Sequence, residues 1–338
     1  MPAAFATPAA FLDALDRLPA SDAAARDAAT ARQAQLTKPA GSLGRLEEIA
    51  IFMAGWQGRP RPQLHRARIA VFAGNHGVAA RGVSAFPADV TAQMVANFER
   101  GGAAINALAR AAGLELAVVP LDLDRPTADI ATAPAMDAQE TLAALNAGAA
   151  AVTPGLDLFI PGEMGIANST PAAALCAAAF GGDPRDWVGP GTGVMGAALA
   201  AKHAAVDAAL ALHRADARDP FEMLRRLGGR ELAAIAGAVV AARMRRVPVL
   251  LDGFIATAAL APLASHRPAI LDHCLAAHRS AEPGHARLLD RLALSPLLAL
   301  DMRLGEASGA AVAAQIVRAA LAAHDGMATF AEAGVAGA

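Results

Sequence analysis

Two glutamates set among glycines are the residues of this sequence best suited to chemistry. Glu163 lies in the run GEMG and Glu306 in the run GEASG. Each follows a short apolar stretch and precedes a helical one, so both carboxylates are expected where a strand gives way to a helix. A carboxylate in such a loop can move a proton or stabilise a positive charge. At a helix start it can also simply stabilise the helix dipole, and that interpretation stays open for Glu306.

The same two loops have the composition of a phosphate site. Asn168, Ser169 and Thr170 suit the cap of a helix, and Pro171 suits its first turn. Backbone N–H groups at the start of a helix can bind a phosphate. A plain structural turn explains either loop equally well when it is taken alone. Glycines, carboxylates and hydroxyls nevertheless gather where a polar ligand needs them.

Polar residues also follow the other predicted strands. His76 comes after the first strand, Asp122 and Asp124 after the second, Asp252 after the fourth and Arg303 after the last. In open α/β sheets, ligands bind at the carboxyl ends of the strands. We therefore expect these residues to face a shared ligand pocket.

Known metal and hydrolase motifs are missing from the sequence. The histidines form no HExxH spacing, and the cysteines form no CxxC. The loose group His273, Cys274, His278 and His285 fits no ligand pattern for a metal. Neither GxSxG nor GxxxxGK[ST] occurs. The sequence therefore predicts no metal site and no bound cofactor.

Short apolar runs that alternate with long helical stretches must position these residues. The predicted strands span residues 67–74, 115–122, 156–163, 247–253, a weaker run near 268–276, and 296–303. Helical stretches begin near Pro87, Asp137, Asn168, Val194, Glu231, Phe254 and Glu306. This alternation predicts an α/β protein with a mainly parallel sheet flanked by helices, a Rossmann-like domain. Residues 1–60 read as helices and residues 61–338 as the α/β catalytic domain.

Composition excludes several classes of protein. The net charge is −2 and there is no long Lys/Arg block, so no nucleic-acid partner is expected. No uninterrupted apolar run is long enough to cross a bilayer, so no membrane association is expected. Cys176 and Cys274 stand far apart in apolar surroundings, which is typical of a reducing compartment. The first residues lack the basic region of a signal peptide, so we expect a cytoplasmic protein.

Five ordered blocks carry a resemblance to a known family. The chain resembles the nicotinate-nucleotide–dimethylbenzimidazole phosphoribosyltransferases from about residue 30 to its end. This resemblance implies a homodimer whose small helical domain is built partly from residues 1–60. It also implies two small-molecule substrates, nicotinate mononucleotide and a benzimidazole base. The blocks are TKPAGSLGRLEEIA (37–50), AGNHGVAARGVSAFP (73–87), PGEMGIANSTPAAAL (161–175), VLLDGFIATAAL (249–260) and DMRLGEASGAAVA (301–313).

The resemblance also implies roles for individual residues. Glu306 stands where the family has its catalytic base, and Glu163 matches a second acidic residue of the active site. The implied nucleotide and phosphate contacts are Lys202, Ser280, Arg303, Gly165 and Gly305. The acceptor base is expected against Phe86, Gln93, Met94, Met164 and Leu304, and His76 and Asp252 are expected at the same site. Asn75, Phe86 and Met94 depart from residues common in the family, which leaves the preferred acceptor base open.

Two other classes of protein are alternatives to this interpretation. Asp122 and Asp124 invite a magnesium-dependent transferase that uses phosphoribosyl pyrophosphate, but Arg125-Pro126-Thr127 follows them instead of a Thr/Gly-rich phosphate loop. Magnesium dependence of the activity would favour that class. A nucleotide- or corrinoid-binding module needs no pair of strand-end glutamates. Binding of both substrates without turnover would favour the module.

Overall fold

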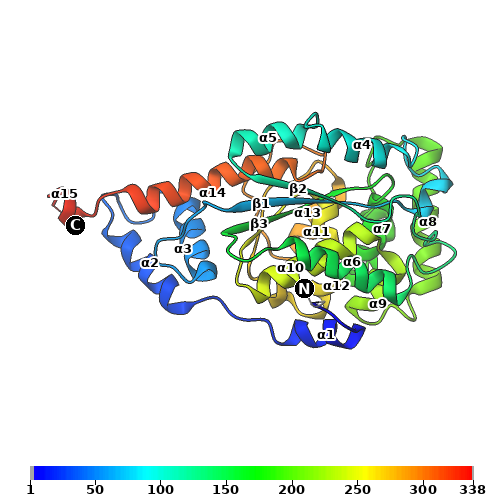
Figure 1. Ribbon diagram of the computed structural model, residues 1–338, viewed down its shortest axis with the longest axis horizontal. Coiled ribbons are helices and arrows are strands. Elements are labelled where there is room, and N and C mark those ends of the chain that lie inside the picture. The colour runs from blue at the N-terminus through cyan, green and yellow to red at the C-terminus, as the bar shows by residue number, and fades with distance from the viewer. Residues whose placement is uncertain (1–3, 337–338) are drawn as a thin grey trace.

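A five-stranded parallel sheet with helices on both faces forms the body of the protein (Figure 1). The computed structural model describes residues 4–336. The strands run in the order β2-β1-β3-β4-β5, so the chain reverses its direction of winding between β1 and β3. The predicted α/β class and parallel sheet are confirmed. The strands are β1 (Ala67–Ala73), β2 (Glu115–Pro120), β3 (Leu158–Met164), β4 (Val249–Leu251) and β5 (Cys274–Ala276).

The central strands are apolar on both faces because helices cover both. On β1, Ala70 and Phe72 join one buried core, whereas Ile69 and Val71 join the other. Side chains on a strand alternate between the two faces of the sheet, which produces this division. A strand buried on both sides reads as a continuous apolar run, and this explains why the sequence predicts β1 and β3 so clearly.

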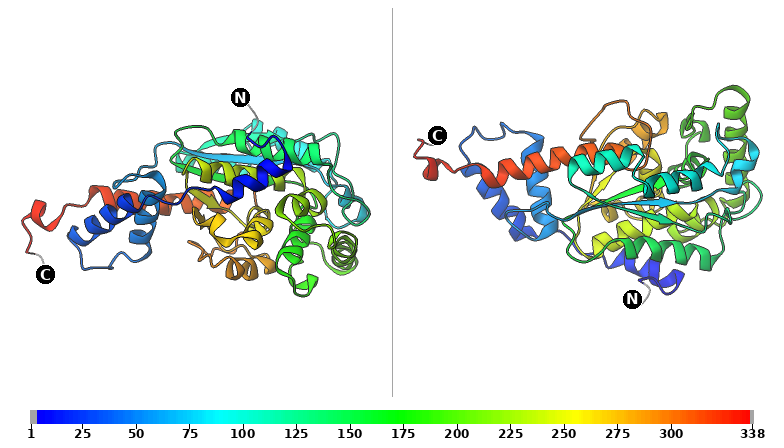
Figure 2. Two further views of the ribbon diagram at one scale, coloured as in Figure 1. Left: turned by 90° about the horizontal axis from the view of Figure 1, so that it is seen from below. Right: turned by 45° about the horizontal axis from the view of Figure 1, so that its top comes forward.

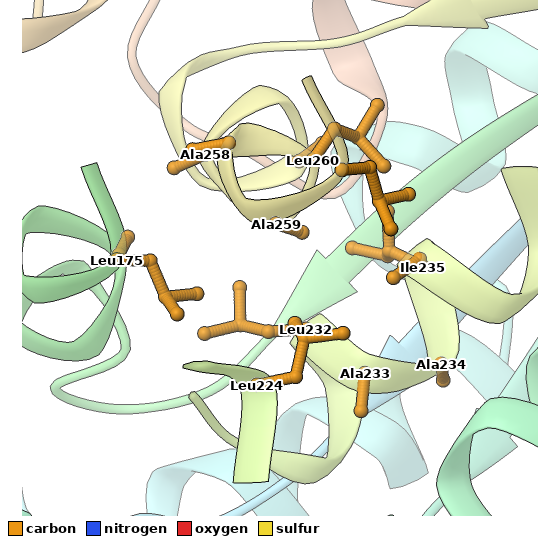
Figure 3. Close-up of a cluster of buried hydrophobic side chains, with 14 of the residues drawn as sticks. Leu175, Leu224, Leu232, Ala233, Ala234, Ile235, Ala258, Ala259 and Leu260 are labelled. Carbon is orange, nitrogen blue, oxygen red and sulfur yellow. The ribbon is translucent and has the colours of Figure 1, made fainter. Parts of the chain in front are cut away.

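The larger core lies between the sheet and a layer of mostly alanine-rich helices. Figure 3 shows Leu175, Leu224, Leu232 and Ile235 converging with Leu260 in this layer, and all five are buried. The helices of the layer are α6 (Ala138–Ala151), α7 (Ser169–Phe180), α9 (Pro220–Leu227), α10 (Arg230–Met244), α11 (Phe254–Ala258) and α12 (Ala261–His266).

Helices α6 and α10 approach each other closely at two glycines. A Cβ atom at Gly148 would lie 1.8 Å from the carbonyl oxygen of Ala234, and one at Gly237 would lie 2.0 Å from that of Leu145. Both separations are far inside van der Waals contact, so only glycine allows the two backbones to pack in this way. Alanine and glycine therefore set the spacing of this layer.

The opposite face of the sheet is covered by α5 (Ala104–Ala112) and the first part of α14 (Ser308–Gly326), and α3 (Arg45–Gln57) packs on α14. The rest of α14 extends away from the sheet beside α2 (Ala23–Gln35) and α3, as Figure 2 shows from two sides. The Gln33 amide contacts the ring of His324 at 2.8 Å, and Arg32 donates to the carbonyl of His324. By contrast, α1 (Pro8–Asp16) lies against α9, where the rings of Phe11 and Phe221 meet.

Two parts of the strand prediction are wrong. Residues 296–303 form a loop with one parallel bridge, between Leu298 and His278. Pro296 has no N–H to donate, and Asp301 has a φ of +54°, so an extended ladder cannot continue through this segment. The weaker run near 268–276 is a strand only at β5, because its first part, Pro268–Leu271, forms a 3₁₀ turn.

The predicted helix starts are confirmed to within three residues. Within residues 4–336, no helix has the length and apolar character that crossing a membrane requires. The remaining elements are α4 (Val90–Glu99), α8 (Gly196–His213), α13 (Pro283–Arg291), α15 (Phe330–Ala333) and the 3₁₀ turns Gly77–Arg81 and Pro184–Asp186.

Candidate active site

A cavity of about 470 Å³ opens beyond the carboxyl end of β3. Its position beside the reversal between β1 and β3 is the usual ligand site of a doubly wound sheet. Five segments complete the walls: residues 83–94, the glycine-rich loop 189–192, residues 253–255, residues 278–282, and the loop that leads into α14. Ten predicted site residues line the cavity: Phe86, Met94, Glu163, Met164, Gly165, Ser280, Arg303, Leu304, Gly305 and Glu306.

Four other predicted site residues lie outside the lining. Gln93 is exposed on α4, and Lys202 is buried in α8 behind the cavity wall. His76 follows β1 as expected, but its ring is buried against Glu231, with Nε2 and the nearer carboxylate oxygen 2.5 Å apart. Asp252 accepts a hydrogen bond from the backbone N–H of Ala310, which ties β4 to the first turn of α14.

Glu163 is buried at the end of β3, with one oxygen accepting a hydrogen bond of 2.5 Å from the Asn168 side chain. Asn168 occupies the cap position of α7 but its side chain does not cap the helix. Burial raises the pKa of Glu163 to about 8, and the nearby carboxylates of Asp252, Glu231 and Glu306 add to the rise. The hydrogen bond from Asn168 acts in the opposite direction. This group therefore holds its proton near neutral pH.

Glu306 precedes α14 in a strained loop. It has a φ of +62° and Ala307 a φ of +67°, a region that residues other than glycine rarely adopt. The helix begins at Ser308, so Glu306 lies just before the helix start and not within it. One of its carboxylate oxygens is buried without a hydrogen-bond partner among the described residues. Burial raises its pKa to about 7, which is suited to a group that exchanges a proton at neutral pH.

Gly305 brings the two glutamates together. It has a φ of +84°, and a Cβ atom at this position would lie 2.3 Å from a carboxylate oxygen of Glu163. Only glycine fits both the backbone conformation and the space. The β3 loop and the α14 loop are thus in direct contact, and their carboxylates share one end of the cavity.

Lys202 supports the cavity wall from behind. Its ammonium group donates to the hydroxyl of Ser169 at 2.7 Å and to the carbonyl of Gly189 at 2.8 Å. Burial lowers the pKa of Lys202 to about 8, whereas the carboxylate of Glu282 acts to raise it. Lys202 therefore lies next to the cavity, and the contact with a phosphate that the family resemblance implies stays a prediction.

Several lining residues are not among those that the sequence predicts. Glu282 is buried, and one of its oxygens accepts from the N–H of Gly191 at 3.0 Å. The hydroxyl of Thr192 accepts from the N–H of Ala85 at 3.0 Å and so joins loop 189–192 to the wall that carries Phe86. The remaining unpredicted members with polar side chains are Ser84, Asn168, Ser169 and His278. In the sequence, Asn168 and Ser169 are signalled by the loop after the third predicted strand and Thr192 by the glycine-rich run GPGTG.

The acidic pair that suggests a magnesium-dependent transferase lies elsewhere. Asp122 pairs with Arg125 at 2.8 Å and borders a separate hollow beside α6, and neither Asp122 nor Asp124 lines the main cavity. In residues 4–336, no three His, Cys, Asp or Glu side chains are grouped so that they could hold a metal ion.

A parallel α/β sheet with a carboxylate-lined cavity at its switch point defines a doubly wound protein with an enzyme-like site. A family model described as phosphoribosyltransferase matches residues 18–335. The chain belongs to the family of nicotinate-nucleotide–dimethylbenzimidazole phosphoribosyltransferases.

Individual relatives agree with this assignment. The protein of this name from Novosphingobium aromaticivorans is 67% identical over 333 residues, which cover 98% of each chain. The protein of the same name from Methylorubrum extorquens is 59% identical over 318 residues, covering 94% of this chain and 93% of the relative. The crystal structure of CobT from Thermus thermophilus has a TM-score of 0.87 at 43% identity, covering 93% of this chain and all of that one.

Proposed function

We propose that the cavity is the active site for transfer of ribose 5-phosphate from nicotinate mononucleotide to 5,6-dimethylbenzimidazole or a related base. The products are α-ribazole 5′-phosphate and nicotinate, and the first of these supplies the lower ligand of cobalamin. Membership of the family supports the reaction. The observation that carries the assignment of the site is the meeting of Glu163 and Glu306 through Gly305 in one enclosed cavity.

The leaving group needs no general acid. The pyridine nitrogen of nicotinate mononucleotide is cationic, and cleavage of its bond to ribose releases a neutral ring. The ribose carbon gains positive charge as this bond breaks. A carboxylate close to that carbon stabilises the charge, and we assign this role to Glu163. A bound cation also favours the ionised form of a buried carboxyl group, so the cationic nucleotide acts against the burial that raises the pKa of Glu163.

The attacking base must lose a proton, and we assign its removal to Glu306. Benzimidazole attacks through one ring nitrogen, and the N–H of its other nitrogen then becomes acidic. Glu306 lines the cavity, and its carboxylate is the group that we propose accepts that proton. Attack on the face opposite the departing nicotinate inverts the ribose carbon, so a β-linked substrate gives an α-linked product.

The acceptor base fits the apolar part of the lining. Phe86 is 53% exposed and Leu304 57% exposed, so both present apolar surface that a flat aromatic ring can cover. Met94 and Met164 also belong to the apolar lining. We propose that the nucleotide contacts the polar lining, which includes Ser169, Ser280 and Arg303.

We infer the assembly and the cellular setting from the resemblance to the family. We propose a cytoplasmic homodimer in which α2, α3 and the end of α14 form the small helical domain. Residues 61–338 supply most of the catalytic domain. The packing of α2 on α3 and of α3 on α14 supports this division, and α1 extends from it along the larger body.

Incubation with nicotinate mononucleotide and 5,6-dimethylbenzimidazole in the presence of EDTA tests the proposed reaction. We expect α-ribazole 5′-phosphate, identified by mass and by retention against a standard. Turnover that disappears in EDTA and returns with magnesium would instead support the phosphoribosyl-pyrophosphate class. Binding of both compounds without any product would support a binding module.

A further inference from the structure

Asp252 is a buried acid beside the active site whose role the proposed reaction leaves unexplained. It follows β4 directly and is 2% exposed, so its charge is costly to bury without partners. One of its oxygens accepts a hydrogen bond of 2.9 Å from the backbone N–H of Ala310. The same oxygen lies 3.5 Å from Nε2 of His278, whose ring is also buried. Asp252 does not line the cavity, so its contacts are with neighbouring elements and not with a ligand.

Helix α14 lacks a cap of its own, and Asp252 takes the place of one. The cap residue is Ala307, which has a φ of +67° and no side-chain acceptor. The first N–H groups of a helix have no partner within the helix, and the side chain of the cap residue usually binds that of the second or third residue. Ala310 is the third residue of α14. Asp252 therefore supplies, from another strand, the acceptor that Ala307 cannot.

The anchored turn of α14 follows the strained loop that carries Glu306. Positive φ angles at Gly305, Glu306 and Ala307 persist only where the surrounding structure fixes them. The ring of His278 holds the same turn, because a Cβ atom at Gly309 would lie 2.2 Å from the Cδ2 atom of this ring. The end of β4, the segment after β5 and the start of α14 thus meet directly behind Glu306.

The charge of Asp252 also acts on Glu306. Burial raises the pKa of Glu306 to about 7, and the negative charge of Asp252 adds to the rise, whereas the backbone of Ile105 acts to lower it. The titratable side chains that adjoining elements bring to this place are Glu163 from β3, Asp252 after β4 and His278 after β5. A nearby negative charge makes a carboxylate a stronger proton acceptor.

We propose that Asp252 is the positioning residue of the proton acceptor: through Ala310 it fixes the first turn of α14, and with it the loop that places Glu306 in the cavity. Asp252 touches neither substrate. This inference rests on the proposed function, because it takes Glu306 as the base of the reaction.

Two substitutions separate the hydrogen bond of Asp252 from its charge. D252A removes both and releases the loop, so kcat should fall about ten- to a hundred-fold. The KM values for nicotinate mononucleotide and dimethylbenzimidazole should change less than about three-fold, because no substrate contact is lost. D252N keeps an oxygen that can accept from Ala310, so its kcat at pH 8 should stay within about three-fold of wild type. Without the charge, Glu306 should ionise at lower pH, and kcat/KM for dimethylbenzimidazole should fall less than in wild type between pH 8 and pH 6.

D157A is the matched control for these variants. Asp157 is also buried and accepts hydrogen bonds of 2.9 Å from the backbone N–H groups of His65 and Arg66. It precedes β3 and therefore lies at the opposite edge of the sheet from the cavity. D157A should lower Tm, but it should leave both the kcat of the folded protein and its pH profile at the wild-type values.

The double variant D252A/E306Q tests whether Asp252 acts through Glu306. Its turnover should be no lower than that of E306Q, because the residue that Asp252 positions can no longer accept the proton. Effects that multiply would overturn the proposal, and so would a D252A variant with normal kcat and a raised KM for the nucleotide. A pH profile of D252N identical to that of wild type would overturn it even if D252A fails to fold. Full turnover in E306Q alone, or absence of product from the wild-type protein, would instead reject the proposed function.

Discussion

Glu163 and Glu306 are the same kind of side chain in two different settings. Glu163 lies at the end of a strand and receives a hydrogen bond from Asn168, whereas one oxygen of Glu306 has no partner in residues 4–336. Burial raises the pKa of both, to about 8 and about 7. Two carboxyl groups with different environments can take different parts in one reaction. We therefore keep the charge-stabilising role for Glu163 and the proton-accepting role for Glu306.

The pKa of Glu306 makes a prediction about the dependence of rate on pH. A general base must be ionised, so kcat/KM should rise with pH and level off above about 7. Below that value the rate should fall about ten-fold for each pH unit, because one proton blocks the base. The measurement is kcat/KM for dimethylbenzimidazole between pH 5 and pH 9. A flat profile across pH 6–8 would contradict a base with this pKa.

The raised pKa of Glu163 makes a prediction about stability. In the unfolded chain the carboxyl group of Glu163 loses its proton above its ordinary pKa of 4.5, whereas in the folded protein it keeps the proton up to about pH 8. The free energy of unfolding should therefore fall as pH rises from about 4.5 to about 8. A ten-fold difference in proton affinity between the folded and the unfolded protein changes the free energy of unfolding by about 1.4 kcal/mol. Glu163→Gln removes this effect and can still accept a hydrogen bond from Asn168. The variant should therefore gain a few degrees in Tm at pH 8 and less at pH 5.

Thermal melting of Glu163→Gln and wild-type protein at the two pH values makes the comparison. An equal change in Tm at pH 5 and pH 8 would mean that Glu163 is not protonated in the folded state near neutrality.

Among the strands and helices, those that depend on a local sequence pattern can be predicted from the sequence. Continuous apolar runs identify β1 and β3, and alanine-rich stretches identify the long helices. Residues 296–303 have the same apolar character but form a loop, because Asp301 adopts a positive φ that the pattern of apolar residues does not reveal. The loop nevertheless runs beside β5 and delivers Arg303 and Leu304 to the cavity. Its contribution to the site can therefore be predicted from the sequence, although its structure cannot.

The close contact of Gly305 with Glu163, in the loop before α14, predicts the effect of a substitution at this glycine. Gly305→Ala would place a Cβ atom 2.3 Å from Glu163 and force a residue with a side chain into φ +84°. Strain of about 1–3 kcal/mol should displace the loop and lower turnover by about ten-fold or more. Gly326→Ala is the matched control, because that glycine ends the same helix and has open space around it. Similar kcat values in both variants would show that the two glutamates need not be held this closely.

At the scale of the whole molecule, the cavity combines segments that are distant in the sequence. Residues that follow strands can be predicted as site residues, since strand ends in a parallel sheet share one edge. Thr192 and Glu282 escape such a prediction, because only three-dimensional packing brings loop 189–192 and residues 278–282 to this edge. His76 and Asp252 also follow strands, but their side chains turn into neighbouring elements and not into the cavity.

The shape of the cavity predicts its tolerance toward acceptor bases. Phe86, Met94 and Leu304 form an apolar wall, and such walls discriminate a methyl group by only about 1–3 kcal/mol. Benzimidazole without the two methyl groups should therefore still react, with a higher KM than 5,6-dimethylbenzimidazole. Competition between acceptor bases at equal concentration provides the measurement. A clear preference for adenine would require polar contacts to the base that this wall does not supply.

Glu306 is the residue that we propose removes the proton from the attacking base, and Glu306→Gln tests this role most directly. Glutamine keeps the size of the side chain but cannot accept the proton as a carboxylate does. At saturating substrates, turnover should fall by about a hundred-fold or more, with little change in Tm. Glu163→Gln, measured beside it, shows whether the second acid can replace the first. A Glu306→Gln variant that retains more than about a third of wild-type turnover would show that Glu306 is not the proton acceptor.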